Sequence, residues 1–324
     1  MNSLKNNLPL FVPSFSSKGN LFFPKGDGKF VSDNYELPEI LNIRLSETYL
    51  VSAYDIYYGF MPQDPEMWPE TRYLFIDSGG YETNDSFDLS ERNKYNYHVL
   101  PWDEEKMKEV YRRVLTCSKF TNTTIILSGF DSCAGINDQL NRFADLQQEF
   151  PTAVINQLIK LTDRMDDVAR ILINSHKLSD IQILGFTEKE LGHTLKERLI
   201  HVMLIKHELN NAGWNGLIHV FGGLEPSLSR LYFIAGADIF DGLSWQRTRY
   251  KGNATLYEPH NYFASSTEEE NKLWMMIDNL SELRSIKDDL GILLDYRAQL
   301  SEQLGEKLKD NNVTVFDLLS VLEG

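Results

Sequence analysis

The sequence predicts an α/β protein, a (β/α)8 TIM barrel followed by a C-terminal helical extension. Short apolar runs without internal alternation recur along the chain as far as residue 242, and strands of this kind are typical of parallel sheets buried on both faces. Segments with the periodicity of amphipathic helices separate several of these runs, which indicates repeated strand–helix units. The chain has 324 residues, enough for one such barrel and an appendage.

Eight apolar runs are the predicted strands of this barrel. In chain order they are residues 9–15, 48–56, 72–80, 123–131, 169–175, 181–186, 216–223 and 236–242. Helical patterns lie between several of them, such as residues 103–120, and residues 154–165 are assigned to a helix before the fifth strand. The intervals between the first three strands are less regular, so we interpret them as insertions.

The pattern changes from about residue 266, where leucine and isoleucine begin to recur at spacings of three and four. A long helical segment up to residue 310 and a short one over residues 313–324 are predicted. We therefore divide the chain into a barrel domain, residues 1–262, and a helical extension, residues 263–324. The extension is expected to pack on the barrel, and the alternative is self-association as a homodimer.

Composition and charge restrict the classes of function. The two cysteines, Cys117 and Cys133, are too few for a disulfide framework or a cysteine-rich zinc site. No segment approaches the ~18 consecutive apolar residues of a membrane span, so we expect a cytoplasmic protein without membrane contact. The net charge of −15 disfavours tight, non-specific binding of nucleic acid, although a local basic track remains compatible with it.

Polar and glycine residues end most of the predicted strands. They are Asp77, Asp131, Asn174, Gly185, Gly222, Gly223 and Asp241. A single aspartate after a strand is ordinary turn or capping chemistry. Three of them at the carboxyl ends of barrel strands, where the active sites of such barrels lie, favour a catalytic site instead.

Two carboxylates suit chemistry at a glycosidic bond, because one can attack the anomeric carbon while the other moves the proton. Glycine at a strand end lets the backbone approach a ligand closely. Tyr81 and Phe221 stand beside such glycines and could enclose a flat ring. The pattern alone thus indicates a site for a base or a sugar.

Several segments resemble, in the same order, motifs of the tRNA-guanine transglycosylase superfamily, whose members are (β/α)8 barrels that exchange guanine for a 7-deazaguanine. The matching segments are Asp77-Ser78-Gly79-Gly80-Tyr81-Glu82, Phe130-Asp131-Ser132-Cys133 and the run from Gly236 to Arg247. Residues 218–226 and 49–56 are similar to two further strand motifs of that family. The resemblance extends over roughly residues 9–255.

The resemblance implies roles for the catalytic residues and their neighbours. Asp241 would be the nucleophile on C1′ of a flipped nucleotide, and Asp77 the general acid and base for the leaving and incoming bases. Arg247 would hold a phosphate near the nucleophile. Ser78 and Gly222, within the matching motifs, would contact the substrate.

The same resemblance implies how the base would be read. Asp131 would accept hydrogen bonds from N1–H and the exocyclic amine of guanine, and the Gly185 N–H would donate to O6. Asn174 stands where the family has a glutamine that reads the base. Tyr81 and Phe221 would stack on its two faces.

The sequence departs from the family in parts that face the polynucleotide. The three clustered cysteines of the family's zinc subdomain are missing, since no cysteine follows Cys133, and no cofactor is expected. Glu82 replaces a glutamine, Ser132 a glutamate, and Trp245-Gln246 a Pro-Thr pair. With the acidic charge, these changes favour DNA over tRNA as the acceptor of a 7-deazaguanine such as preQ0, with partner proteins to deliver or open the duplex.

Two other functions and one structural question stay open from the sequence. A non-catalytic subunit on the same fold would have been indicated by loss of Asp77 or Asp241, and both are present. A hydrolase that releases a base from a nucleoside would need the same residues. Residues 83–105 follow the third strand and are either a lid or a surface loop.

Overall fold

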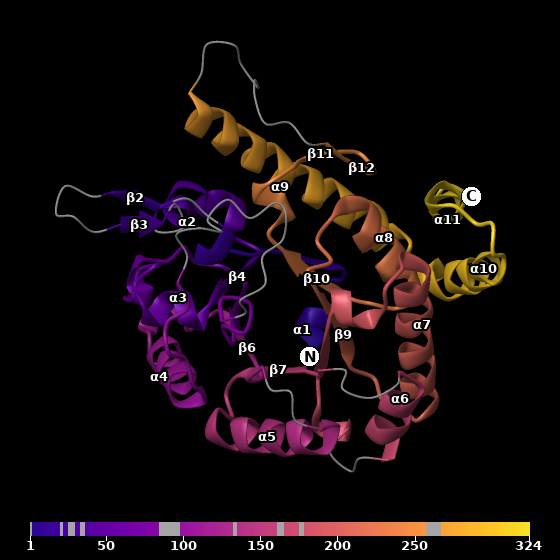
Figure 1. Cartoon of the computed structure of the whole chain (residues 1–324), viewed down its shortest axis with the longest axis horizontal. Helices are drawn as coiled ribbons and strands as arrows, with labels where there is room; N and C mark the ends of the chain where they lie inside the picture. The colour runs from indigo at the N-terminus through magenta and orange to yellow at the C-terminus, as the bar shows by residue number, and fades with distance from the viewer. Residues whose placement is uncertain are drawn as a thin grey trace. The chain divides into compact units, whose positions relative to one another are not determined.

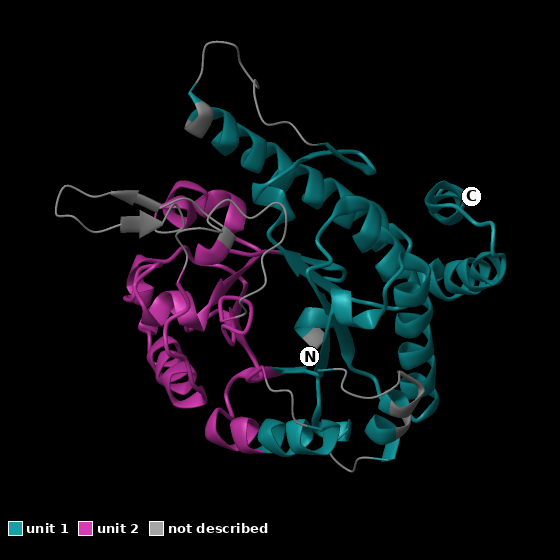
Figure 2. Cartoon of the chain, viewed as in Figure 1, with its two compact units in different colours: residues 1–12, 133–144, 156–324 teal, residues 13–132, 145–155 magenta. Residues whose placement is uncertain are grey.

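The structure is a computed structural model of the chain. It describes residues 2–19, 22–24, 30–32, 36–83, 98–131, 135–160, 165–174, 178–256 and 267–324. The chain divides into two compact units, which Figure 2 distinguishes by colour. Unit 1 comprises residues 1–12, 133–144 and 156–324, and unit 2 comprises residues 13–132 and 145–155.

The main sheet has eight parallel strands, as the sequence predicts, and Figure 1 labels several of them, including β4, β6, β7, β9 and β10. They are β1 (Leu10–Pro13), β4 (Thr48–Ser52), β5 (Tyr73–Asp77), β6 (Thr124–Ser128), β7 (Val154–Leu158), β8 (Ile183–Thr187), β9 (Leu217–Phe221) and β10 (Ile239–Gly242). Their order in the sheet is β1-β10-β9-β8-β7-β6-β5-β4. A parallel bridge between Ser14, directly after β1, and Leu50 in β4 nearly closes the ring. The fold is therefore a (β/α)8 barrel, and this prediction is confirmed.

Helices connect the strands in the order expected of βα units. They are α3 (Ala53–Tyr57), α4 (Glu104–Leu115), α5 (Ile136–Glu149), α6 (Met165–Asn174), α7 (Leu195–Asn211) and α8 (Pro226–Ala235). Short elements lie outside this series. Before α3 come α1 (Asn2–Lys5), the hairpin β2 (Phe22–Pro24) and β3 (Phe30–Ser32), and α2 (Leu37–Ile40), and after β10 comes the hairpin β11 (Arg249–Lys251) and β12 (Ala254–Leu256). Many of the strand side chains form the core, and all of Tyr73 to Ile76 in β5 are fully buried.

The prediction for the fifth strand is wrong. The sequence predicts this strand over residues 169–175, but Ala169 to Asn174 belong to α6. The fifth strand of the main sheet, counted along the chain, is β7, which lies in a segment predicted to be helical. The run ARILIN is apolar enough to pass for a buried strand, and a short apolar run cannot be assigned by periodicity alone. The polar pair Asn156 and Gln157 lies inside β7 and interrupts its apolar pattern, although both side chains are buried.

The C-terminal extension is helical, with α9 (Glu268–Ile292), α10 (Arg297–Lys309) and α11 (Val315–Leu319). A capping box between Thr267 and Glu270 fixes the start of α9. These helices belong to unit 1, where both α9 and α10 contact α8. The predicted boundary between residues 262 and 263 lies outside the described residues. No helix in the described ranges is long and apolar enough to cross a membrane.

Candidate active site

Asp241 lies in β10, and one oxygen of its carboxylate accepts a hydrogen bond from the backbone of the turn that follows β9. The Gly222 N–H donates to Asp241 Oδ1 at 2.9 Å. Gly222 has a φ of +84°, a conformation that favours glycine, and this turn directs its N–H toward β10. Asp241 is only 6 % exposed, so the orientation of its side chain is set by the protein.

His219 of β9 lies beside the same carboxylate. Its Nε2 is 3.3 Å from Asp241 Oδ1, and its ring is fully buried. The Nδ1 atom is 2.7 Å from the side-chain nitrogen of Asn156 in β7. The ring also stacks on Phe221, with centroids 4.0 Å apart and planes inclined by 25°. Neither His219 nor Asn156 was a predicted site residue.

Gly185 of β8 completes this group because it leaves room for the Phe221 ring. A Cβ at position 185 would clash with the ring and would lie 3.0 Å from the side-chain oxygen of Asn156. Only glycine allows this close approach. Unit 1 therefore brings together four of the predicted site residues on three strands: Gly185 in the middle of β8, Phe221 and Gly222 at the end of β9, and Asp241 near the end of β10. The prediction that Gly185 ends its strand is wrong, because β8 continues to Thr187.

Asp77 ends β5 in unit 2, where a tight turn follows it. The Gly79 N–H donates to Asp77 Oδ2 at 3.2 Å, an Asx-turn contact. Gly79 has a φ of +89°, and a Cβ on it would lie 2.7 Å from Tyr54 Cβ and 2.9 Å from Trp102 Nε1. Trp102 also donates from Nε1 to the Ser78 carbonyl at 2.9 Å. The turn that carries the DSGG motif is thus closely packed.

Asp131 follows β6 and packs directly on this turn. A Cβ on Gly80 would clash with the Asp131 carboxylate, so the bare glycine backbone is what lets the two segments meet. Tyr81 continues the turn, with Lys18 Nζ 4.8 Å from its ring centre. Unit 2 therefore brings together Asp77, Ser78, Tyr81 and Asp131. Ser132 and Cys133 of the adjoining motif lie outside the described residues.

A pair of buried carboxyl groups that the sequence did not indicate lies in the same unit. Asp55 is fully buried and accepts hydrogen bonds from the Ser17 amide at 2.6 Å and from the Ser17 hydroxyl. Glu82 is 2 % exposed and accepts from Ser16 and, at 2.8 Å, from Ser52.

Burial raises the pKa of Asp55 well above its usual range, and the charge of Glu82 raises it further, with a smaller contribution from Asp77. Burial likewise raises the pKa of Glu82, against the opposing effect of its serine hydrogen bonds. Lys18, which is fully buried, lowers the pKa of Glu82 by its charge and donates to the Tyr81 carbonyl at 3.2 Å.

Two of the predicted site residues, Asn174 and Arg247, lie outside the barrel strands. Asn174 is exposed at the end of α6, so its assignment to the end of the fifth strand is wrong. The polar residue near the end of that strand is Gln157, which is 3 % exposed and donates to the Leu158 carbonyl at 2.6 Å. Arg247 is half-buried and follows the 3-10 turn Ser244–Gln246 after β10.

The described end of the 83–105 segment contacts the Asp77 turn. Besides the Trp102 contact, the Leu100 N–H donates to the Tyr54 hydroxyl at 2.8 Å. Tyr58 donates to the Pro101 carbonyl. Residues 84–97 lie outside the described residues, so the alternatives of a lid and a surface loop stay open.

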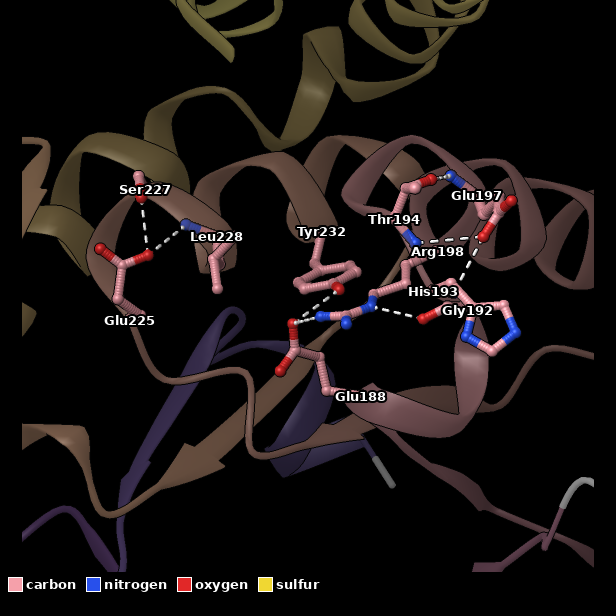
Figure 3. Close-up of polar contacts among 10 residues, drawn as sticks. All are labelled: Glu188, Gly192, His193, Thr194, Glu197, Arg198, Glu225, Ser227, Leu228 and Tyr232. Atoms are coloured by element: carbon pink, nitrogen blue, oxygen red, sulfur yellow. Dashed lines mark hydrogen bonds and ion pairs between the residues drawn. The ribbon is translucent and has the colours of Figure 1, made fainter. Parts of the chain in front are cut away.

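Polar contacts in unit 1 fix the segments that follow β8 and β9 (Figure 3). Glu188 accepts from Arg198 at 2.5 Å and from the Tyr232 hydroxyl at 3.2 Å. Arg198 also donates to the Gly192 carbonyl at 2.8 Å. Glu225 accepts from the Leu228 N–H at 3.2 Å and caps α8. These bonds join the segment after β8 to α7 and α8 and cap the start of α8.

Comparison with known proteins adds no family to this description. No protein-family model matches the chain, and no curated protein matches it. Among the residues that the structure describes, no group of three or more His, Cys, Asp and Glu side chains is placed to hold a metal ion.

Proposed function

We propose that the protein is a base-exchange transglycosylase, which replaces guanine in a polynucleotide by a 7-deazaguanine through a covalent glycosyl intermediate. The proposal rests above all on Asp241, whose buried carboxylate at a strand end is oriented by the Gly222 amide. Beside it, the Phe221 ring lies against the bare backbone of Gly185, an arrangement suited to a flat base. The order of the sequence motifs supports the same function.

In the proposed reaction Asp241 attacks C1′ of the guanosine or deoxyguanosine. The bond from C1′ to the base breaks, and its electron pair leaves with guanine, which takes a proton from Asp77. In the second half, the incoming base gives a proton to Asp77 and attacks C1′, which releases Asp241. General acid catalysis of this kind contributes about 10²–10⁴-fold to the rate.

Recognition of the base is assigned to several side chains and one backbone amide. Asp131 would accept from the N1–H and amine of a guanine-type base, a pattern that adenine cannot supply. The Gly185 N–H would donate to O6, and Tyr81 and Phe221 would stack on the ring. Gln157, near the end of β7, would read the base in place of Asn174.

We further propose DNA as the favoured polynucleotide and preQ0 as a representative incoming base. The net charge of −15 opposes binding of a long phosphate backbone by the protein alone, so partner proteins would deliver or open the duplex. Arg247 would contact a phosphate next to the target nucleotide.

The test is to incubate the protein with guanine-containing DNA or RNA oligonucleotides of equal sequence and to measure intact mass with and without preQ0. We expect an adduct on Asp241 that the DNA oligonucleotide forms faster, and labelled preQ0 in the product strand. Asp241→Asn should form no adduct, whereas Asp289→Asn, an exposed carboxylate on α9, should react like the wild type. Release of free base without incorporation of preQ0 would instead identify a hydrolase.

A further inference from the structure

A continuous line of polar contacts runs from β7 through His219 to Asp241. Asn156 and His219 are both fully buried, and their side-chain nitrogens are 2.7 Å apart. An amide nitrogen can only donate. The Nδ1 atom of His219 must therefore accept, and the neutral ring carries its hydrogen on Nε2.

Nε2 of His219 lies beside the carboxylate of the proposed nucleophile. Nε2 is 3.3 Å from Asp241 Oδ1, the same oxygen that accepts from the Gly222 N–H at 2.9 Å. The stacked Phe221 ring, 4.0 Å away, keeps the imidazole plane in place. Two donors from β9 and its turn thus approach one of the two carboxylate oxygens.

We infer that His219 is a positioning residue for the nucleophile, held by Asn156 in the form with hydrogen on Nε2, so that Oδ1 of Asp241 is fixed and Oδ2 attacks C1′. This inference rests on the proposed function. Oδ2 forms the bond to C1′, and the electron pair of the bond between C1′ and the base leaves with guanine. The imidazole neither gains nor loses a proton in this step.

The same contact serves the second half of the exchange. In the glycosyl ester Oδ1 is the carbonyl oxygen, and negative charge returns to it when the incoming base displaces the carboxylate. Preorganised N–H donors at a site of developing charge stabilise the transition state. The Gly222 amide is such a donor, and His219 Nε2, 3.3 Å from the same oxygen, would be the second.

The form of the His219 ring can be measured without any substrate. Two-dimensional NMR of the full-length protein with 15N-labelled histidine should give the pattern of hydrogen on Nε2 for His219. His201 is an internal control, because its Nδ1 lies 2.5 Å from the Leu191 carbonyl oxygen, which only accepts, so it should give the opposite pattern. Asn156→Asp replaces the donor by an acceptor of the same shape and should move hydrogen onto His219 Nδ1. A wild-type His219 with hydrogen on Nδ1 would overturn the inference.

Kinetics give the second test. His219→Phe keeps a ring that can stack on Phe221 and removes the donor, so adduct formation should slow by about tenfold to a hundredfold, as for loss of a hydrogen bond to a charged group. His219→Gln restores an N–H donor and should recover part of the rate, with KM for the incoming base unchanged in both variants. Adduct formation by His219→Phe at the wild-type rate would contradict the inference.

These tests separate the inference from the proposed function. If the wild-type protein forms no adduct with either polynucleotide, the proposed function is wrong. The NMR spectrum still tests whether His219 lies against Asp241. In that case Asp241→Asn must shift the His219 Nε2 resonance and leave that of His201 unchanged. An unshifted resonance overturns the placement of His219 against Asp241.

Discussion

Arg297 of α10 forms an ion pair with Asp238, the residue directly before β10, with Nη1 2.7 Å from Oδ1. The Asp238 side chain is 2 % exposed, and it also accepts from the Ile218 N–H at 2.9 Å. Arg297 donates further to the Phe233 carbonyl at 2.6 Å. The C-terminal extension is thereby tied to the strand that carries the proposed nucleophile.

Removal of this arginine should strongly destabilise the protein. Arg297→Met would leave a buried carboxylate with Lys206, at 3.2 Å, as its remaining cationic partner. Breaking a buried ion pair costs about 3–5 kcal/mol, so we expect a fall in the free energy of unfolding of about 3 kcal/mol in urea titrations.

A more exposed arginine supplies the control for this variant. Arg113 of α4 pairs with Glu109 at 3.0 Å, and their side chains are 34 % and 55 % exposed. Arg113→Met should cost less than about 1 kcal/mol. Equal losses in the free energy of unfolding for the two variants would contradict the prediction that the buried Arg297 ion pair contributes more to stability.

The Asp238 carboxylate also predicts how stability depends on acid. Burial alone would raise its pKa, but the charges of Arg297 and Lys206 hold it below the usual range. A carboxyl group whose folded pKa is lowered contributes stability above its unfolded pKa of about 3.9, and loses it as pH falls through the folded pKa. As the pH falls from 5 to the acid transition, the free energy of unfolding of Arg297→Met should therefore decrease less than that of the wild type. Urea unfolding at each pH measures this difference.

Glu82 should have the opposite dependence. Because burial raises its folded pKa, its contribution to stability is present below about pH 4.3, the ordinary glutamate pKa, and is lost as pH rises through the raised value. Glu82→Gln mimics the protonated form, so its free energy of unfolding relative to the wild type should increase from pH 4 to pH 8. The exposed Glu208→Gln is the control, and a flat difference for Glu82→Gln would contradict the prediction.

Seven of the eight predicted strands overlap those of the barrel, because each is a short, continuous apolar run. The fifth failed for a physical reason. β7 carries Asn156 and Gln157, which are buried because they bind other polar groups, and single-sequence hydropathy treats such residues as solvent-facing. α6 has the reverse pattern, since its apolar residues Ile171, Leu172 and Ile173 are consecutive.

The sequence predicts the site residues that directly follow a strand, but not the buried residues that contact them. Asp77, Asp131 and Asp241 stand out because they follow apolar runs. His219 lies inside a strand, and only the sheet register, which pairs it with Ile239 of β10 and Gly185 of β8, brings it next to Asp241. Asp55 likewise depends on long-range contact, because its partner Ser17 is 38 residues away.

Gly185 should not tolerate a side chain. In Gly185→Ala the added Cβ would displace the Phe221 ring, and overpacking of this kind costs about 1–3 kcal/mol. If this ring stacks on the base, exchange should fall by at least tenfold, a loss of about 1.4 kcal/mol in binding the transition state. Gly291→Ala, on α9 where a Cβ meets nothing within 4 Å, should stabilise the protein by up to about 1 kcal/mol and leave exchange unchanged.

Trp102 should support the turn that carries Asp77. Trp102→Phe keeps an aromatic ring against Tyr54, whose centroid lies 5.4 Å from that of Trp102, and removes the hydrogen bond to the Ser78 carbonyl. We expect a loss of about 1 kcal/mol in the free energy of unfolding and a larger relative loss in the rate of base exchange, because the freed carbonyl adjoins Asp77, the proposed general acid. Trp274→Phe, at a position 48 % exposed on α9, should change neither quantity. A Trp102→Phe protein that loses stability but exchanges bases at the wild-type rate would mean that the turn does not position Asp77.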